Sequence, residues 1–237
     1  MYLKQFEDFL KTVNLCAYRD KYLPIKIVEM DMPKDVQALN ALCNVYWDQK
    51  RFISFDEFYL EYKNGCRLPL KIFFKKTQMC SRCFNKGLPA RIYRTWASII
   101  TQIHAGYVAE SVFGQGTVKM SEDLDHDGAD FQINYRSLTL NYQVKKETFS
   151  REVRAEKKTK KTLPGELINI TYKVPDFDMI LNPNKKKGGL KKGFKDFKEK
   201  WLDTKMIKLL DNGFVVFTPQ IFREKKKEID DKIKMGS

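Results

Sequence analysis

The sequence predicts a mixed α/β fold, with helices packed on a mixed central β-sheet and a helical N-terminal extension. Residues 88–113 place apolar side chains at helical spacing. Residues 130–135 and 139–145 instead alternate apolar and polar side chains with a period of two, as half-buried strands do. The chain has 237 residues, of which 43% are hydrophobic. That is enough to bury a core without disulfides or metals.

The N-terminal part is predicted to be mainly helical. Residues 1–20 place four apolar side chains at helical spacing, with acids and lysines between them. Residues 35–47 and 55–62 show the same pattern over shorter stretches. Residues 22–33 contain two prolines and are expected to form an extended link between these helices.

The longest periodic segment, residues 88–113, is predicted to be a core helix. Its apolar side chains form one continuous stripe. The stripe consists of Leu88, Ile92, Trp96, Ile99, Ile100, Ile103 and Tyr107. Gly114 and Gly116 interrupt the pattern, so the helix is expected to end there and to lead into a loop.

The hydrophobic period changes after this helix. The two alternating segments are separated only by a short Arg-Ser link, which is typical of an antiparallel hairpin. Four further elements are predicted: a strand at 167–172, a helix at 194–210, a short strand at 214–217 and a basic helix or tail at 219–234.

No linker of distinct composition interrupts the chain, so one domain is expected over residues 1–237. Three parts are expected within it: a mainly helical N-terminal part at 1–87, an α/β core with the candidate site at 88–220, and a basic C-terminal helix or tail at 221–237.

The charge balance points to a polyanionic partner. The chain carries 44 Lys and Arg against 30 Asp and Glu, a formal net charge of +14. Nucleic acid is the first expectation and an anionic membrane surface the second, while many solvated lysines are the structural alternative. No apolar run approaches the length of a membrane span, so no membrane partner is expected. Five irregularly spaced cysteines predict free thiols and a cytoplasmic location.

One polar strand face carries the candidate chemistry. Asp130 opens the first strand of the predicted hairpin. Gln143 and Lys145 follow on the second strand, with Val144 between them. Strand alternation places Gln143 and Lys145 on one face and Val144 on the other. A carboxylate, an amide oxygen and a lysine are therefore expected to meet at one end of a two-stranded ribbon.

These groups suit the hydrolysis of a phosphodiester. Mg²⁺ prefers oxygen ligands, which the side chains of Asp130 and Gln143 and the backbone carbonyl of Val144 supply. The metal would polarise the phosphate and activate a water, and Lys145 would orient that water or offset charge in the transition state. The pattern Asp…(Glu/Asp)-x-Lys is the signature of PD-(D/E)xK nucleases. Here Gln143 stands in place of the usual acid.

An acidic stretch, SEDLDHDGAD, precedes the first strand. Five acids fall within nine residues of this basic chain: Glu122, Asp123, Asp125, Asp127 and Asp130. Such a cluster is repulsive unless a cation relieves it, which strengthens the expectation of a metal site. The alternative is a solvated surface loop, which suits Glu122, Asp123 and Asp127.

The chain resembles the TaqI-type restriction endonucleases. The resemblance lies in four stretches that follow the family's order and span most of the chain. These stretches are FEDFLKTVNL…YRDKYLPIKIVEMDMP at 6–33, ARIYRTWASIITQIH at 90–104, LDHDGAD…QVKKETFSREVRAE at 124–156 and LDNGFVVF at 210–217. Four colinear stretches are far more specific than the short metal motif, although residues 50–85 and 175–205 are less similar.

The resemblance implies a Mg²⁺-dependent type II enzyme with a restriction-endonuclease-like core, which cuts both strands of DNA within a short palindrome. For the family that palindrome is TCGA. The resemblance places the metal-binding and catalytic acids at Asp125 and Asp130, and the catalytic lysine within Lys145-Lys146. Periodicity favours Lys145, because Lys146 shares a strand face with Val144, and Lys146 is kept in reserve. A companion DNA methyltransferase is also implied, with no stable complex expected.

Basic residues crowd the segment after the second strand. A charge run is usually a solvated face, but beside a phosphodiesterase site it is expected to contact DNA phosphates. The expected contacts are Lys146, Arg151, Arg154, Lys157 and Lys158. A palindromic target has two-fold symmetry, so a homodimer is the expected assembly.

Other metal-binding or titratable residues have a simpler interpretation. Cys80-x-x-Cys83 has the spacing of half a zinc site, but only Cys66 and His104 are left to complete it, so free thiols are favoured. His104 lies near the apolar stripe and is expected to be a hydrogen-bonded core or interface histidine. His126 either approaches the metal or a phosphate or lies at the surface.

Two other functions compatible with the sequence differ in what they would do to DNA. A structure-specific or weakly specific PD-(D/E)xK repair nuclease would leave a smear or cut junctions. A non-enzymatic DNA-binding protein would bind with a steep salt dependence and would cleave nothing.

Overall fold

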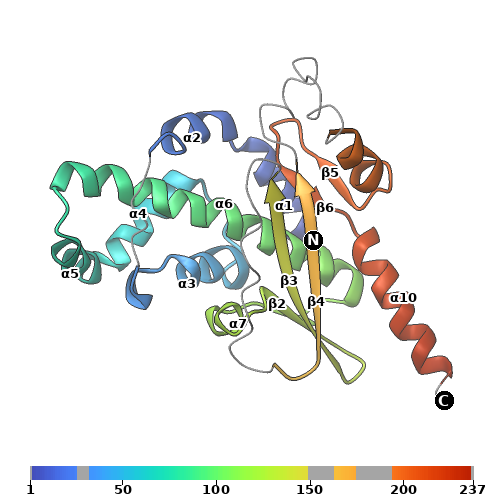
Figure 1. Ribbon diagram of the computed structural model, residues 1–237. Coiled ribbons are helices and arrows are strands. Elements are labelled where there is room, and N and C mark those ends of the chain that lie inside the picture. Colours follow the sequence, from blue (N-terminus) through green and yellow to red (C-terminus); the bar gives the residue numbers. More distant parts are fainter. Residues whose placement is uncertain (1, 26–31, 149–162, 175–193, 236–237) are drawn as a thin grey trace.

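The computed structural model describes residues 2–25, 32–148, 163–174 and 194–235 (Figure 1). Within these residues a four-stranded sheet and a two-stranded sheet are packed with helices. The larger sheet contains both antiparallel and parallel pairs. The mixed α/β class predicted from the sequence is therefore confirmed.

The N-terminal part consists of short helical segments. They are α1 (Tyr2–Thr12), α2 (Leu15–Tyr22), η1 (Lys34–Val36), α3 (Leu39–Leu42), η2 (Cys43–Asp48), α4 (Phe55–Gly65) and α5 (Arg67–Thr77). The prediction of one helix over residues 1–20 is wrong, because the chain breaks near Asn14. The Asn14 side chain accepts a hydrogen bond from the Ala17 N–H at 3.0 Å and begins a second helix.

Three further N-terminal boundaries differ from the prediction. Residues 35–47 were expected to form one helix, but they are divided among η1, α3 and η2. The helix expected at 55–62 is confirmed as α4, whose start is fixed by reciprocal hydrogen bonds between Ser54 and Glu57. Helix α5 was not predicted.

Helix α6 (Ser81–Phe113) runs from the α5 end of the molecule to the sheet (Figure 1). It includes the predicted helix at 88–113 but begins seven residues earlier. Its stripe is buried as expected, with Trp96, Ile100 and Ile103 fully enclosed. The helix ends at Gly114, whose φ of 118° is a conformation that glycine adopts readily.

The larger sheet has the strand order β1-β2-β3-β4. Its strands are β1 (Val118–Lys119), β2 (Phe131–Tyr135), β3 (Leu138–Thr148) and β4 (Glu166–Val174). The predicted hairpin is confirmed: β2 and β3 are antiparallel, and the turn between them is Arg136-Ser137, both with positive φ. β4, which matches the strand predicted at 167–172, pairs with β3 in parallel.

The second sheet corrects another prediction. A helix was expected over residues 194–210, but helical structure there ends with η4 (Lys198–Leu202). The chain then forms β5 (Ile207–Leu209), which pairs with β6 (Val215–Phe217). Burial of Ile207 against the protein outweighs the helical periodicity of this segment. α10 (Gln220–Met235) follows, where a basic helix or tail was expected.

One face of the sheet is covered by aromatic side chains. Phe131 and Tyr142 stack across β2 and β3 with ring centroids 5.1 Å apart, and Phe222 of α10 packs on both. Tyr172 of β4 packs edge-on against Phe217 of β6. The opposite face of the hairpin is left for polar residues. Within the described ranges, no helix combines the length and apolarity that a membrane crossing requires.

Candidate active site

The carboxylate of Asp130 is fixed against strand β3. Asp130 immediately precedes β2, and its backbone N–H donates to the Tyr142 carbonyl at 2.7 Å. Its Oδ2 accepts a hydrogen bond from the Val144 N–H at 2.6 Å. Only 8% of the residue is exposed. Two backbone contacts thus hold one acid beside the middle of the candidate motif.

The backbone of Val144 offers a second oxygen at the same edge. In a strand, the N–H and C=O of one residue point to the same side. Because the Val144 N–H points to Asp130, its carbonyl points to that side too. The neighbouring residues Gln143 and Lys145 are in register with Asn169 and Thr171 of β4. The expected carbonyl donor therefore lies on the Asp130 side of β3.

Burial along β3 follows the predicted alternation. Val144 is 7% exposed and belongs to the hydrophobic core, whereas Gln143 and Lys145 are half-buried. The register aligns Lys146 with Tyr172, which is 1% exposed. Gln143 and Lys145 thus occupy positions on the polar face, and Lys146 occupies a position of the opposite parity. The side chain of Lys146 lies outside the described part of the structure.

The acidic stretch is a helix and not the loop that was expected. α7 (Glu122–Asp127) begins where the Ser121 side chain accepts the Leu124 N–H at 3.2 Å, and it ends at Gly128 with φ 103°. A serine cap, acids in the first turn and a following glycine are helix signals that the sequence contained. Ala129 N–H donates to the Leu124 carbonyl at 2.9 Å and turns the chain into β2.

Asp125 is carried by α7, one tight turn before Asp130. Its charge acts on Cys43 of η2: burial first, and then the carboxylates of Asp125 and Asp48, raise the pKa of the Cys43 thiol to about 12. Cys43 is thus a protonated core thiol. The acidic helix therefore lies close to η2 as well as to the candidate site.

The oxygen donors suit a hard cation such as Mg²⁺. The expected ligands are the carboxylates of Asp125 and Asp130, the amide of Gln143 and the carbonyl of Val144. Only two of them are residue types of a His, Cys, Asp and Glu cluster. Accordingly, no group of three or more such residues that would hold a metal occurs in the described part of the chain. The Asp130 carboxylate, oriented by a single amide, fits the role of a central ligand.

The predicted DNA contacts fall largely outside the described residues. Arg151, Arg154, Lys157 and Lys158 belong to residues 149–162, which begin directly where β3 ends. Lys146 is described only as a position on β3. Their roles stay predictions.

The other titratable candidates lie elsewhere. The Cys80 Sγ accepts the Cys83 N–H at 3.2 Å and so begins α6, and both thiols are exposed. His104 is fully buried, with Nε2 3.2 Å from Glu7 Oε1, in agreement with a hydrogen-bonded core histidine. His126 is exposed on α7.

The parallel strand β4 extends the polar face in a way that the sequence analysis missed. Asn169 and Thr171, both exposed, are in register with Gln143 and Lys145. Nearby, the fully buried Asn141 accepts from Gln132 and donates to the Pro164 carbonyl, each at 2.9 Å. The alternation of polar residues along 166–174 was the available signal, but only the pairing shows which strand they join.

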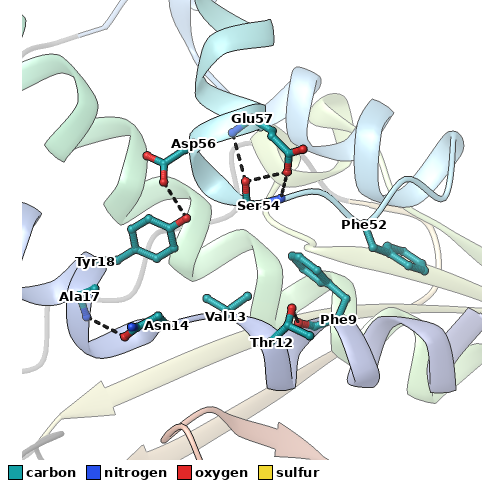
Figure 2. A pocket seen from close by; sticks show the side chains of 10 residues that line it. All are labelled: Phe9, Thr12, Val13, Asn14, Ala17, Tyr18, Phe52, Ser54, Asp56 and Glu57. Atoms are coloured by element: carbon teal, nitrogen blue, oxygen red, sulfur yellow. Dashed lines mark hydrogen bonds between the residues drawn. The ribbon is translucent and has the colours of Figure 1, made fainter.

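A cavity of about 460 Å³ lies apart from this site, between α1, α2 and the start of α4 (Figure 2). Its polar groups are engaged in local structure: Tyr18 donates to Asp56 at 2.9 Å, and Ser54 and Glu57 cap α4. The lining residues are Phe9, Thr12, Val13, Asn14, Ala17, Tyr18, Phe52, Ser54, Asp56 and Glu57. It shares no residue with the predicted nuclease site.

Comparison with known proteins shows the family. The sequence model of the TaqI restriction endonuclease matches residues 3–229. The type II restriction enzyme TaqI of Thermus aquaticus is 35% identical over 177 residues, which cover 72% of this chain and 67% of that enzyme. The type II restriction enzyme TthHB8I of Thermus thermophilus is 37% identical over 158 residues, 64% of this chain and 60% of that enzyme. No solved structure matches significantly. The chain therefore belongs to the TaqI restriction endonuclease family, and with it to the type II restriction enzymes, which are site-specific deoxyribonucleases.

Proposed function

We propose that this chain is a Mg²⁺-dependent endonuclease that hydrolyses phosphodiester bonds of double-stranded DNA within a short palindrome, TCGA or a related site. The observation that carries the proposal is the 2.6 Å hydrogen bond from the Val144 N–H to Asp130. It holds an acid beside the strand segment Gln143–Lys145, which is the arrangement that a PD-(D/E)xK nuclease needs. Membership in the family supports the same class of reaction.

Asp130 is the proposed central ligand of the metal, and Asp125, the Gln143 amide and the Val144 carbonyl complete the protein's share. Mg²⁺ commonly takes one or two carboxylates and leaves other positions to water and substrate phosphate. When bound, it supplies a Lewis acid that withdraws charge from the scissile phosphate. Gln143 contributes a neutral oxygen, so this site carries one negative charge fewer than a site with an acid there.

Lys145 is the proposed catalytic lysine. Its position on the polar face places a cation beside Gln143 and on the strand that holds Asp130. From there the ammonium group donates hydrogen bonds to the attacking water or to a phosphate oxygen, and it offsets the charge that develops in the transition state. Hydrolysis then adds one water across one P–O bond.

The assembly and the setting are proposed from the same chemistry. Lys146, Arg151, Arg154, Lys157 and Lys158 contact DNA phosphates, and a homodimer places one site on each strand of the palindrome. A companion methyltransferase protects the same site in host DNA without a stable complex. The enzyme works in the cytoplasm as one nuclease domain. The free state of all five cysteines agrees with that location.

The test is incubation of an unmethylated plasmid with the pure protein, with Mg²⁺ or with EDTA, followed by sequencing of the fragment ends. The expected result is discrete Mg²⁺-dependent ends that share one short palindrome. A smear, or cutting restricted to junctions, would contradict the sequence specificity and favour a repair nuclease. An intact plasmid with a salt-sensitive gel shift would contradict cleavage and leave a DNA-binding protein.

A further inference from the structure

A long stretch of this chain contains no acid. Residues 62–109 hold no Asp or Glu, although 30 acids in 237 residues would place about six in a stretch of that length. The same stretch holds nine basic residues: Lys63, Arg67, Lys71, Lys75, Lys76, Arg82, Lys86, Arg91 and Arg94. Its charge is therefore uniformly positive, whereas the two signs are mixed in most of the chain.

Six of these cations lie exposed on α5 and the first two turns of α6. This surface, called the basic arm below, consists of Arg67, Lys71, Lys75, Lys76, Arg82 and Lys86. None of the six forms an ion pair with a residue that the structure describes. By contrast, Lys225, Lys226 and Lys232 of α10 each lie within 3.3 Å of a carboxylate. The basic arm is a field of unpaired positive charge.

The start of α6 adds to this field. A helix N-terminus carries a partial positive charge and is normally accompanied by acids. The first turn of α6 has no acid and holds Arg82 instead, and the last turn of α5, just before it, holds Lys75 and Lys76. Three cations thus gather at a helix corner where the backbone is already positive. An anion at this corner would relieve their repulsion.

Apolar side chains are exposed between these cations. Leu68 is 68% exposed and Ile72 48% exposed, and their spacing of four residues places them on one face of α5. Methyl groups next to ammonium and guanidinium groups suit a surface that packs on sugars while its cations bind phosphates. A purely solvated lysine face needs no such residues.

The arm lies at a defined distance from the sheet. Figure 1 places α5 and the start of α6 at the end of the molecule away from the strands. From Arg82 to His104, α6 rises by roughly 33 Å, at about 1.5 Å per residue. One turn of B-DNA spans about 34–36 Å. A duplex seated on the sheet and running along α6 therefore reaches the arm about one turn from the cleavage site.

We propose that the basic arm binds the phosphates of double-stranded DNA about one helical turn outside the site that is cut. This inference rests on the proposed function, which supplies the DNA. An anionic membrane would also attract a basic helix with exposed leucine and isoleucine. DNA is favoured because the chain belongs to a family of restriction enzymes.

The test uses binding without cleavage, in EDTA, to cognate duplexes of about 12 and about 40 base pairs. The variant K71Q/K75Q/K76Q removes three charges from the arm. K227Q/K232Q/K234Q removes three exposed lysines from α10 and serves as the matched control. On the long duplex, log K against log salt loses a slope of about 0.9 for each phosphate contact, so the arm variant is expected to lose up to about 2.7. On the short duplex its slope should match that of the wild-type protein.

The outcomes separate the two proposals. An unchanged slope on the long duplex, or an equal loss in the α10 variant, overturns the role of the arm. A loss of binding to anionic phospholipid vesicles, with DNA binding unaltered, would assign the arm to a membrane instead. The proposed function fails on different evidence, namely an absence of Mg²⁺-dependent cuts by the wild-type protein. R67Q/R82Q, which touches neither lysine cluster, repeats the test with an independent pair.

Discussion

Asp130 and Val144 are joined by a hydrogen bond of 2.6 Å from the backbone amide of one to the carboxylate of the other. The bond crosses from the start of β2 to the middle of β3, fourteen residues further along the chain. It orients the acid with a group that no side-chain substitution removes. The carboxylate is thus positioned by the sheet itself, and the residues on either side of Val144 are placed relative to it.

Asp130→Asn is expected to lower cleavage by at least about 100-fold, because an amide is a much weaker ligand for a hard cation. DNA binding should be kept or improved, since the change removes negative charge that faces phosphate. The amide oxygen still accepts the Val144 N–H, so the fold is retained. Cleavage and gel shift check this, with Asp203→Asn, an exposed acid elsewhere, as control. Normal cleavage by the Asp130 variant would remove it from the site.

Lys145→Ala and Lys146→Ala test the assignment of strand faces. Loss of the catalytic lysine is expected to lower the single-turnover rate by about 10²–10⁴-fold. Lys145→Ala should show this loss and Lys146→Ala a smaller one, because Lys146 is in register with the buried Tyr172. The reverse ranking would show that the face assignment is off by one residue.

Gln143→Glu restores the acid of the usual nuclease signature. A carboxylate binds Mg²⁺ more strongly than an amide, so the Mg²⁺ concentration for half-maximal cleavage should fall on the order of ten-fold. Asn169→Asp adds the same charge to the adjacent position on β4 and serves as control. Equal shifts in both variants would indicate a general field effect and would argue against Gln143 as a ligand.

The buried group Glu7, His104 and Lys208 predicts a loss of stability in acid. Burial opposes ionisation of Glu7, but hydrogen bonds from His104 and Lys208 outweigh it and lower the pKa of Glu7 to about 2. This contribution to the free energy of unfolding is complete above pH 4.5 and is lost as the pH falls towards 2. Burial also lowers the pKa of His104, so protonation of His104 favours the unfolded chain below pH 6.5.

Urea unfolding between pH 7 and 3 checks this prediction. The wild-type midpoint should fall throughout this range. Glu7→Gln should unfold at lower urea at pH 7, because Lys208 loses its partner at 2.6 Å, and should change less with pH below 4.5. Glu199→Gln, at an exposed surface pair, should follow the wild-type profile. A parallel profile for Glu7→Gln would exclude Glu7 as the group that titrates.

Gly165→Ala is expected to destabilise the junction between β3 and β4. Gly165 has φ 99°, and a Cβ there would collide with the Thr139 backbone carbonyl. The positive φ alone costs a residue other than glycine about 1 kcal/mol, and the collision with backbone adds to it. Gly65→Ala, which meets open space at the end of α4, is the control and should be neutral or stabilising. Thermal unfolding measures both, and equal stability of the two variants would contradict the prediction.

Local patterns were sufficient to predict several parts of this protein. The alternation in residues 130–145 predicted the hairpin and the shared face of Gln143 and Lys145, because a strand has a fixed period of two. The stripe in α6 predicted its burial for the same kind of reason. These features depend on residues that are neighbours in the chain, so their spacing contains the information.

Contacts between distant residues decided the rest. The helical pattern of residues 194–210 gave way to β5, because Ile207 gains burial and pairing with Phe217. The parallel placement of β4, and with it Asn169 and Thr171 beside the site, depends on a partner more than twenty residues away. The sequence alone placed Asp130 and Lys145 on neighbouring strands. Only the tertiary structure aimed the Val144 amide at Asp130, since a hydrogen bond between strands exists only once their register is set.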